Sequence, residues 1–600
     1  MANERNSENA MTEAVHEVPV LIVGAGPAGL AATLLLKQYG IEALTVNRYG
    51  WTANTPRAHY QNQRAIEILR ELKLEDEVMA TGMAPDLARN VVWTETLAGV
   101  EFARIQTYMA ERQDDYRRAS PCESSNIAQC LLEPIMARAA LERGASIRWQ
   151  HEFVDLVQDE NGVTATIEDR LDGRRYQVRA KYVIGADGAR SRVAETLGVK
   201  HEGQEGWAAA VNVWFKADLT KYCAYRPGIL YWTNRPGLDF WVGSGGFINV
   251  RPWNEWVMSF MYDPAQGMPD LSPEALVERV RTLVGDSALE VEVLAASPWQ
   301  MNALVADRMR VGRVFLAGDA VHRHPPSGGL GSNTSMQDAY NLAWKLAAVL
   351  KGEAGAALLD SYETERLPVA RKVVARSMQN IDYFVEVAKA LGFRPGQTAD
   401  EGWRAWEGLA APTGEGVQRR DALSAALALQ RYHFAAHGTE LGTRYPAGAL
   451  AAEQADEDGE RDTAIKSSGI DGELHYVPRA RAGSHLPHAW IERQADRRRM
   501  STLDACGSGR FTLLVGHAGA GWRAAAALVS AATGLTVDVV EIGTGLEYRD
   551  VENAWHALRE TGDDGCLLVR PDKVVAWRSA GLASDPAREL ERVVRAVLAR

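Results

Sequence analysis

Three motifs in this 600-residue sequence place glycine or aspartate directly after a short apolar run, where α/β proteins bind ligands. In the first motif, Gly24, Gly26 and Gly29 of "VGAGPAGL" follow the β-branched run 18–23. Glycines at this spacing let the chain turn sharply, approach a pyrophosphate and pack the next helix against the strand. A second apolar run, 43–46, follows at the distance typical of a dinucleotide-binding unit, so we expect these glycines to bind a dinucleotide.

The second apolar run ends in Asn47 and Arg48, where such a unit usually has an acidic residue that holds the adenosine ribose. The amide oxygen of asparagine also accepts a hydrogen bond from a hydroxyl group, but more weakly than a carboxylate does. We therefore expect both residues at the cofactor, with a weakened contact to the ribose.

The other two motifs each place an aspartate after an apolar strand, Asp187 in "YVIGADGARS" and Asp319 in "VFLAGDAVHRHPPSGGLGSN". A carboxylate at this edge of a sheet is well placed to hold a ribityl hydroxyl group, which indicates a flavin. In the last motif, Pro325 stiffens the turn, while Gly329 and Gly331 allow the backbone to lie against a flat ring.

A helix is expected from about Ser332, with Asn333 in its first turn, directly after this glycine-rich loop. Its unpaired N–H groups and the positive end of its dipole would stabilise negative charge on a reduced flavin ring. We therefore predict that the loop and the start of this helix bind the flavin.

The composition argues against several other classes of protein. A formal net charge of −12 and the lack of a basic block disfavour a nucleic-acid partner. Charges such as Lys345 and Arg523 interrupt the apolar runs, and residues 1–16 lack a signal-peptide pattern, so we expect no membrane partner and a cytoplasmic location. The five cysteines have neither Cys-x-x-Cys nor His/Cys ligand spacing, so we expect no disulfide framework and no metal site.

The ordered motifs "GAGPAG", "GADGARS" and "GDAVHRHPPSGGLGSNTSMQD", followed by "LLDSYETERLPVA", resemble those of the class A flavoprotein aromatic hydroxylases. The phenol hydroxylase branch is most similar, through "TPRAHYQNQRAIEILR", "VRPWNEWV" and "STLDACGSGRFTLLVG", and the resemblance covers nearly the whole chain. It implies FAD as cofactor, NADPH or NADH as co-substrate, O2 and a small phenolic substrate as further partners, and a homodimer. The implied reaction is ortho-hydroxylation of a substituted phenol to a catechol through a C4a-hydroperoxyflavin.

The resemblance also implies an α/β fold, with a Rossmann-like FAD-binding domain, an inserted β-sheet substrate domain and a C-terminal thioredoxin-like domain. Alternating patterns such as "VNVWFKADL" and "EWVMSFMYD" predict strands of the inserted sheet. Cys506 and Cys566 are isolated, which favours a structural or oligomerisation role for the last domain over a redox role. The expected segments are 1–16 (disordered tail), 17–90, 115–200 and 295–385 (FAD), 91–114 and 201–294 (substrate), 386–465 (helical linker) and 466–600 (thioredoxin-like).

His59, in "TPRAHYQNQ", is the candidate base. A neutral phenol has a pKa of about 10, and a base that takes or polarises its proton accelerates oxygen transfer by roughly 10²- to 10⁴-fold. Histidine ordinarily titrates near neutrality, and the resemblance implies that this segment approaches the flavin and the substrate. A packing or helix-capping role is the alternative.

Four further side chains are candidates for the site. Arg57 suits bidentate contact with cofactor phosphates, with a surface salt bridge as the alternative. We expect Arg251 to stabilise the phenolate or reach the nicotinamide, and Trp253 to wall the substrate pocket with Pro325, although tryptophans at this spacing often form core. The resemblance implies that Gln129 contacts the flavin.

Other functions were weighed against phenol hydroxylation. A flavin-dependent halogenase would carry Trp-x-Trp-x-Ile-Pro, which this sequence lacks. The same flavin chemistry on a larger polyketide-type aromatic is the main alternative, and a non-catalytic FAD-binding module is a minor one. His322 and His324 have no third ligand for a metal, so we expect them to hydrogen-bond the loop.

Overall fold

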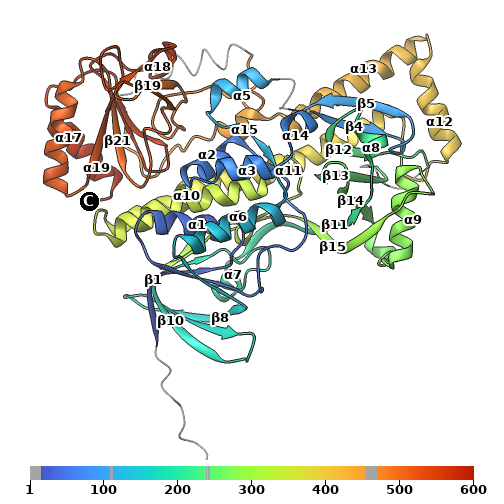
Figure 1. Ribbon diagram of the computed structural model, residues 1–600, viewed down its shortest axis with the longest axis horizontal. Helices are drawn as coiled ribbons and strands as arrows, with labels where there is room; N and C mark the ends of the chain where they lie inside the picture. The colour runs from blue at the N-terminus through green and yellow to red at the C-terminus, as the bar shows by residue number, and fades with distance from the viewer. Residues whose placement is uncertain (1–14, 108–111, 238–239, 241–242, 454–468) are drawn as a thin grey trace, which may run out of the picture.

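The computed structural model of the protein describes residues 15–107, 112–237, 240, 243–453 and 469–600. The expected disordered tail lies outside the described residues except at its end, where the first strand begins at His16. Figure 1 shows three bodies: a sheet with helices above it at the centre, a second sheet at the right, and a C-terminal domain at the upper left. The chain passes between the first two bodies several times before it enters the third.

The first sheet brings the three sequence motifs to one edge. Its strands in spatial order are β16 (Arg310–Val311), β17 (Val314–Leu316), β10 (Arg175–Gly185), β1 (His16–Val23), β2 (Ala43–Asn47) and β7 (Ser146–Trp149). All of them except β16 run parallel, and β8 (His151–Gln158) with β9 (Val163–Asp169) continues from β10 in antiparallel pairs. Ala186 N–H donates to the Val23 carbonyl at 2.8 Å, and Ala317 N–H donates to the Gly185 carbonyl at 3.0 Å. The turns after β1, β10 and β17 therefore lie side by side.

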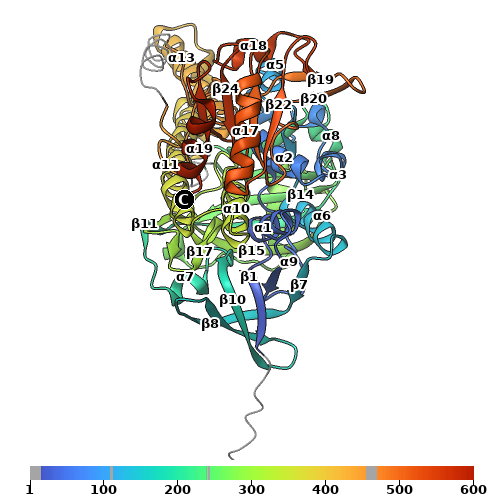
Figure 2. The same cartoon turned by 90° about the vertical axis from the view of Figure 1, so that its left-hand side faces the viewer.

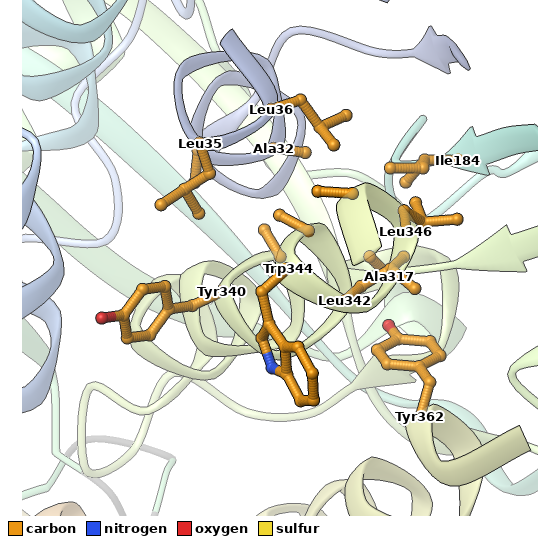
Figure 3. Close-up of a cluster of buried hydrophobic side chains, with 14 of the residues drawn as sticks. Ala32, Leu35, Leu36, Ile184, Ala317, Tyr340, Leu342, Trp344, Leu346 and Tyr362 are labelled. Atoms are coloured by element: carbon orange, nitrogen blue, oxygen red, sulfur yellow. The ribbon is translucent and has the colours of Figure 1, made fainter. Parts of the chain in front are cut away.

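Helices α1 (Pro27–Gln38) and α10 (Gly331–Leu350), which follow the first and third motifs, pack against each other. Figure 3 shows Ala32 and Leu36 of α1 facing Leu342 of α10, with Ile184 of β10 beside them. All four side chains are fully buried. Because burial of a leucine side chain contributes about 1.5–3 kcal/mol, this cluster fixes the two helices relative to the sheet.

The second sheet is mostly antiparallel. Its strands in spatial order are β18 (His322–Arg323), β15 (Glu292–Ala306), β11 (His201–Lys216), β14 (Glu255–Tyr262), β13 (Gly245–Arg251), β12 (Gly228–Thr233), β4 (Asn90–Thr94) and β5 (Glu101–Gln106). Helix α9 (Pro273–Val284) covers one face, while the start of α6 (Gln129–Glu142) and part of α11 (Asp360–Leu391) pack on the other. Since β18 lies within the third motif, this sheet is joined to the candidate flavin loop.

A helical segment leads to the C-terminal domain. It contains α12 (Ala399–Glu407), α13 (Gly414–Leu429), α14 (Arg431–Phe434) and α15 (His437–Leu441). The domain has a four-stranded sheet, β22 (Val537–Glu541), β21 (Phe511–Val515), β24 (Cys566–Val569) and β25 (Val575–Ser579), with α17 (Ala520–Thr533) and α19 (Pro586–Val597) against it. Figure 2 shows α17 and α19 on the side that faces the viewer. This arrangement confirms the predicted α/β fold class.

The C-terminal domain docks on α10 and α11 through buried charges. The Arg570 guanidinium donates to both oxygens of Glu365 at 2.8 and 2.9 Å, and Lys345 Nζ donates to the same carboxylate at 2.8 Å. The side chains of all three residues are fully buried. The rings of Trp344 and Phe511 meet edge to face beside them, with centroids 5.6 Å apart. Within the described ranges, no helix combines the length and apolarity needed to cross a membrane.

Candidate functional site

The glycine-rich turn after β1 is shaped by backbone contacts. Gly24 has φ +104°, and a Cβ there would lie 2.2 Å from the carbonyl oxygen of Ala186. A Cβ on Gly29 would lie 1.9 Å from the carbonyl oxygen of Gly24. A Cβ on Gly26 meets one neighbour, Glu133 Oε1 at 3.8 Å, so this glycine leaves its backbone open to a ligand.

Two helices begin at this edge without a side-chain cap. Helix α1 starts after Gly26 and α10 starts after Leu330, and neither N-terminus receives a side-chain hydrogen bond. The first N–H groups of a helix have no partner inside the helix, and the dipole favours negative charge there. The two N-termini therefore fit the pyrophosphate and the flavin ring of FAD.

The two aspartates of the motifs play different parts. The Asp187 carboxylate accepts hydrogen bonds from Ser191 Oγ at 2.5 Å and the Val193 amide at 3.1 Å, so it organises the start of α7 (Arg192–Thr196). The Asp319 side chain is exposed and makes no hydrogen bond or ion pair within the described part of the chain. The surrounding protein nevertheless raises its pKa by desolvation, against the charges of His322, Arg323 and Arg57. Such a carboxylate is free to bind a ribityl hydroxyl.

Asn47 and Arg48 lie beside the glycine-rich turn, at the end of β2. Asn47 Oδ1 accepts from the Ala25 amide at 3.4 Å, and its Nδ2 group donates to the carbonyls of Tyr49 and Trp51 at 3.4 and 3.3 Å. The Arg48 guanidinium lies 4.9 Å from the centre of the Tyr49 ring. The Asn47 amide thus braces the turn and the loop after β2 in this structure.

A short antiparallel ladder carries the segment of His59. Strands β3 (Tyr60–Gln61) and β6 (Ser125–Asn126) pair, and the ladder continues on one side, where the Ile127 amide donates to the His59 carbonyl at 2.7 Å. The Gln129 amide then donates to the Arg57 carbonyl at 2.8 Å. The structure therefore brings these three candidate residues together, at the start of α6.

The side chain of Asn333 ties this ladder to the flavin loop. Its Nδ2 group donates to the carbonyls of Tyr60 and Gly329 at 2.9 and 2.6 Å, and its Oδ1 accepts from the Asn62 amide at 2.9 Å. Gln61 Nε2 donates to Ser332 Oγ at 3.2 Å in the same place. The side chains of the first α10 turn hold the ladder, while the backbone N–H groups of that turn remain uncapped.

Glu133 is a buried acid that sequence reasoning missed. It lies one helical turn after Gln129, whose Nε2 group donates to Glu133 Oε1 at 2.5 Å. Glu133 Oε2 accepts from the Ala53 amide at 2.6 Å, and burial raises the pKa of the carboxyl. Arg57, in the same loop, is exposed and donates to Thr55 Oγ1 at 3.1 Å. The sequence signal for Glu133 was an acid four residues after Gln129 in a mostly apolar helix.

His59 departs from one expectation. Both of its ring nitrogens are buried and lack a hydrogen-bond partner among the described residues, and burial lowers its pKa to about 4. The ring therefore does not titrate near neutrality, as the sequence led us to expect, because its surroundings disfavour the charged form. At pH 7 it is a neutral imidazole with one nitrogen able to accept a proton.

Arg251 and Trp253 lie at the far end of β13. The exposed Arg251 guanidinium donates to Glu255 Oε2 at 2.9 Å, and Glu255 Oε1 accepts from Trp214 Nε1, also at 2.9 Å. Trp253 packs against the core under the second sheet, with its ring 6.1 Å from the stacked ring of Trp256. No hydrogen bond or ring contact joins either candidate to His59 among the residues that the structure covers.

The loop histidines have separate surroundings. His322 Nε2 lies 3.0 Å from Asp338 Oδ2, an oxygen that also accepts from the Gly318 amide. His324 Nδ1 lies 2.8 Å from the carbonyl of Pro325, which is itself buried, and 3.0 Å from Ser377 Oγ on α11. Both histidines thus hydrogen-bond in and around the loop that leads to α10.

Comparisons with known proteins match this geometry. Residues 17–377 match a family described as FAD binding domain, and residues 479–600 match the family described as aromatic-ring hydroxylase, C-terminal. The chain is 43% identical to 2,4-dichlorophenol 6-monooxygenase of Delftia acidovorans, covering 97% of this chain and 98% of that one. It is 40% identical to phenol 2-monooxygenase of Pseudomonas sp. (strain EST1001), covering 96% and 92%. The crystal structure of the flavin-dependent monooxygenase PieE with FAD and substrate superposes with a TM-score of 0.91 at 44% identity, covering 97% and 99%.

Proposed function

This chain belongs to the FAD-binding aromatic-ring hydroxylases, and from that premise we propose that it converts a substituted phenol to the corresponding catechol. As an FAD-dependent aromatic monooxygenase it uses NAD(P)H and O2, and the balance is one phenol, one O2, one NAD(P)H and one proton to catechol, NAD(P)⁺ and water. Bound FAD supplies the redox chemistry, because it accepts a hydride and activates O2. The observation that carries the proposal is the meeting of the three motifs at one sheet edge with two uncapped helix N-termini.

Separate groups of the chain would bind separate parts of FAD. We propose that the turn at Gly24, Gly26 and Gly29 holds the pyrophosphate and that the open Asp319 carboxylate binds a ribityl hydroxyl. The uncapped first turn of α10 would favour negative charge on the reduced ring. These roles use backbone N–H groups and one carboxylate, all at the same edge.

For the substrate, we propose that the neutral His59 imidazole accepts the phenol proton. The aromatic ring of the substrate attacks the electrophilic oxygen best when it is a phenolate. The His59 nitrogens are enclosed, so the side chain must rotate toward the phenol when substrate binds. The Arg251 guanidinium donates to Glu255 through Nη1, and we propose that its other N–H groups stabilise the phenolate, with Trp253 and Pro325 as walls of the pocket.

NAD(P)H oxidation with product analysis tests this proposal. The purified enzyme is assayed with NADPH and with NADH, against phenol, 2,4-dichlorophenol, 2-hydroxybiphenyl and a bicyclic polyketide-like phenol. We expect a simple phenol to stimulate oxidation and an equal amount of catechol to form. Stimulation by the bicyclic compound alone would instead support the larger polyketide-type substrate, and no stimulation with FAD bound would favour a non-catalytic module.

We also propose a homodimer in the cytosol. The family resemblance implies the dimer, and the five cysteines are all unpaired, as is usual in a reducing compartment. Light scattering during size-exclusion chromatography tests the dimer, and a monomeric mass at working concentration would contradict it.

A further inference from the structure

A buried carboxylate from the helical linker reaches the segment that carries His59. Glu440 lies in α15, and its Oε2 accepts a hydrogen bond from the Tyr60 hydroxyl at 2.8 Å, across 380 positions of sequence. The same hydroxyl lies 3.3 Å from Ser124 Oγ. Glu440 is only 7% exposed, so its charge depends on this contact rather than on water.

The rest of Tyr60 contacts the candidate flavin loop. Its carbonyl accepts from Asn333 Nδ2 at 2.9 Å, and its ring occupies the space where a Cβ on Gly329 would lie, 2.9 Å away. His59 is the preceding residue, and its carbonyl belongs to the same ladder. Tyr60 therefore contacts the loop directly and is joined through the backbone to the candidate base.

We propose that Glu440 is a positioning residue that fixes Tyr60 and, through it, keeps His59 and the flavin loop in their working arrangement. The proposal rests on the function proposed above, which assigns His59 and this loop to the site. It also gives the linker a part in the site that a simple connection between domains would not have.

The burial of Glu440 makes its contact with Tyr60 sensitive to pH. Burial raises its pKa to about 7, while the Tyr60 hydrogen bond and the charge of Arg112 oppose that rise. Above pH 7 the carboxylate accepts a charge-assisted hydrogen bond from Tyr60, and below pH 7 the neutral acid is a weaker acceptor. We therefore expect the Tyr60 contact to tighten as pH rises through 7.

Other titratable and charged groups also lie around α15. The segment of Glu473 and His475 packs against it, with the Thr439 amide donating to the Glu473 carbonyl at 3.0 Å and His475 Nδ1 lying 3.0 Å from the Arg112 guanidinium. His437 Nε2 of the same helix donates to Gln63 Oε1, 2.9 Å away, and its ring stacks on the Tyr116 ring of α5 (Gln113–Ala119) with centroids 3.8 Å apart. Burial lowers the pKa of His437 to about 3, so it is neutral in this range. Arg112 precedes α5, and its guanidinium donates to Asp115 Oδ2 at 3.0 Å.

The absorption spectrum of bound FAD, followed from about pH 5 to pH 9, tests the proposal. We expect the wild-type holoenzyme to show a transition with a midpoint near 7. Glu440→Gln removes the charge and keeps the shape, and Tyr60→Phe removes the donor and keeps the ring on Gly329, so each should abolish the transition. The double variant should behave like either single one, because the two groups act as a unit.

Glu415→Gln is the matched control, since Glu415 is an exposed acid in the first turn of α13. It should keep the wild-type transition. A transition near pH 7 that persists in Glu440→Gln would overturn the proposal, as would opposite behaviour of Glu440→Gln and Tyr60→Phe. Because this readout needs no phenol, it separates the inference from the proposed reaction: an enzyme that hydroxylates nothing would refute the reaction alone.

Discussion

Two buried glutamates, Glu440 and Glu365, differ in how many donors surround them. Within the described residues Glu440 accepts one hydrogen bond, from Tyr60. Glu365 accepts from four groups, namely Asn341, Lys345, Arg570 and the Ala449 amide. Despite complete burial, the paired cations Arg570 and Lys345 hold the pKa of Glu365 far below its ordinary range, whereas burial raises that of Glu440 to about 7. The number and charge of the donors, rather than depth, decide whether a buried acid stays charged or titrates.

Removal of the main cation from the paired acid is the largest expected disruption. Arg570→Ala would remove the bidentate partner of the buried Glu365 carboxylate, and breaking a buried ion pair costs about 3–5 kcal/mol. We expect a corresponding loss in the free energy of unfolding, measured by urea denaturation. Arg523→Ala is the control, because the Arg523 pair with Glu541 is exposed and should cost less than about 1 kcal/mol. An equal loss in the free energy of unfolding in both variants would show that the buried network contributes no more stability than an exposed ion pair.

His59, the candidate base, resembles Glu440 in having few hydrogen-bond partners among the described residues. We expect His59→Ala to lower hydroxylation at pH 7 by about 10²-fold, because neutral His59 accepts the phenol proton. Since burial lowers its pKa to about 4 in the free enzyme, His59 is neutral there above pH 5, and no acid limb of kcat/KM near pH 6.5 should belong to it. Steady-state rates with catechol analysis check this, and a loss below tenfold with unchanged coupling would remove His59 from the mechanism.

Asp319 is a third acid, to which no described residue donates a hydrogen bond, yet it is open rather than enclosed. We expect Asp319→Ala to weaken FAD binding about tenfold, which corresponds to one lost hydrogen bond to a charged group. Titration of the apoprotein with FAD, followed by quenching of flavin fluorescence, measures this. Asp307→Ala serves as a comparison, since Asp307 pairs with Arg308 and lies outside the motif. Unchanged FAD affinity would show that the open carboxylate does not face the cofactor.

The smallest expected effect is a gain in stability. Folding raises the pKa of the Glu440 carboxyl from about 4.3 in the unfolded chain to about 7. The folded protein therefore loses stability as the pH rises between these two values. Glu440→Gln should therefore raise the melting temperature at pH 8 by on the order of 1–2 °C and leave it nearly unchanged at pH 4. Thermal scans at both pH values check the sign, and destabilisation at pH 8 would mean that the Tyr60 contact outweighs the burial of charge.

The sequence predicted the features that depend on local chain direction. Gly24, Asp187 and Asp319 follow parallel strands, and such strands end at one edge whatever else the fold does, so their meeting was predictable. The pairing of Tyr60 with Glu440 was not, because nothing local to either residue indicates a contact over 380 positions. The two-residue strands β3 and β6 are likewise too short for a periodic signal. The lowered pKa of His59 depends on burial by distant segments, so residue type alone predicted it wrongly.

The docking of the C-terminal domain on α10 has a consequence for the order of biosynthesis. Glu365 and Lys345 leave the ribosome long before Arg570, which follows Glu365 by 205 residues. At about 5–20 residues per second, that interval lasts roughly 10–40 s. During it helices α10 and α11 carry the Glu365–Lys345 pair and the Trp344 ring without the Arg570 and Phe511 side chains that cover them later. Stable packing of this part of α10 and α11 is therefore expected only once the C-terminal domain has been synthesised.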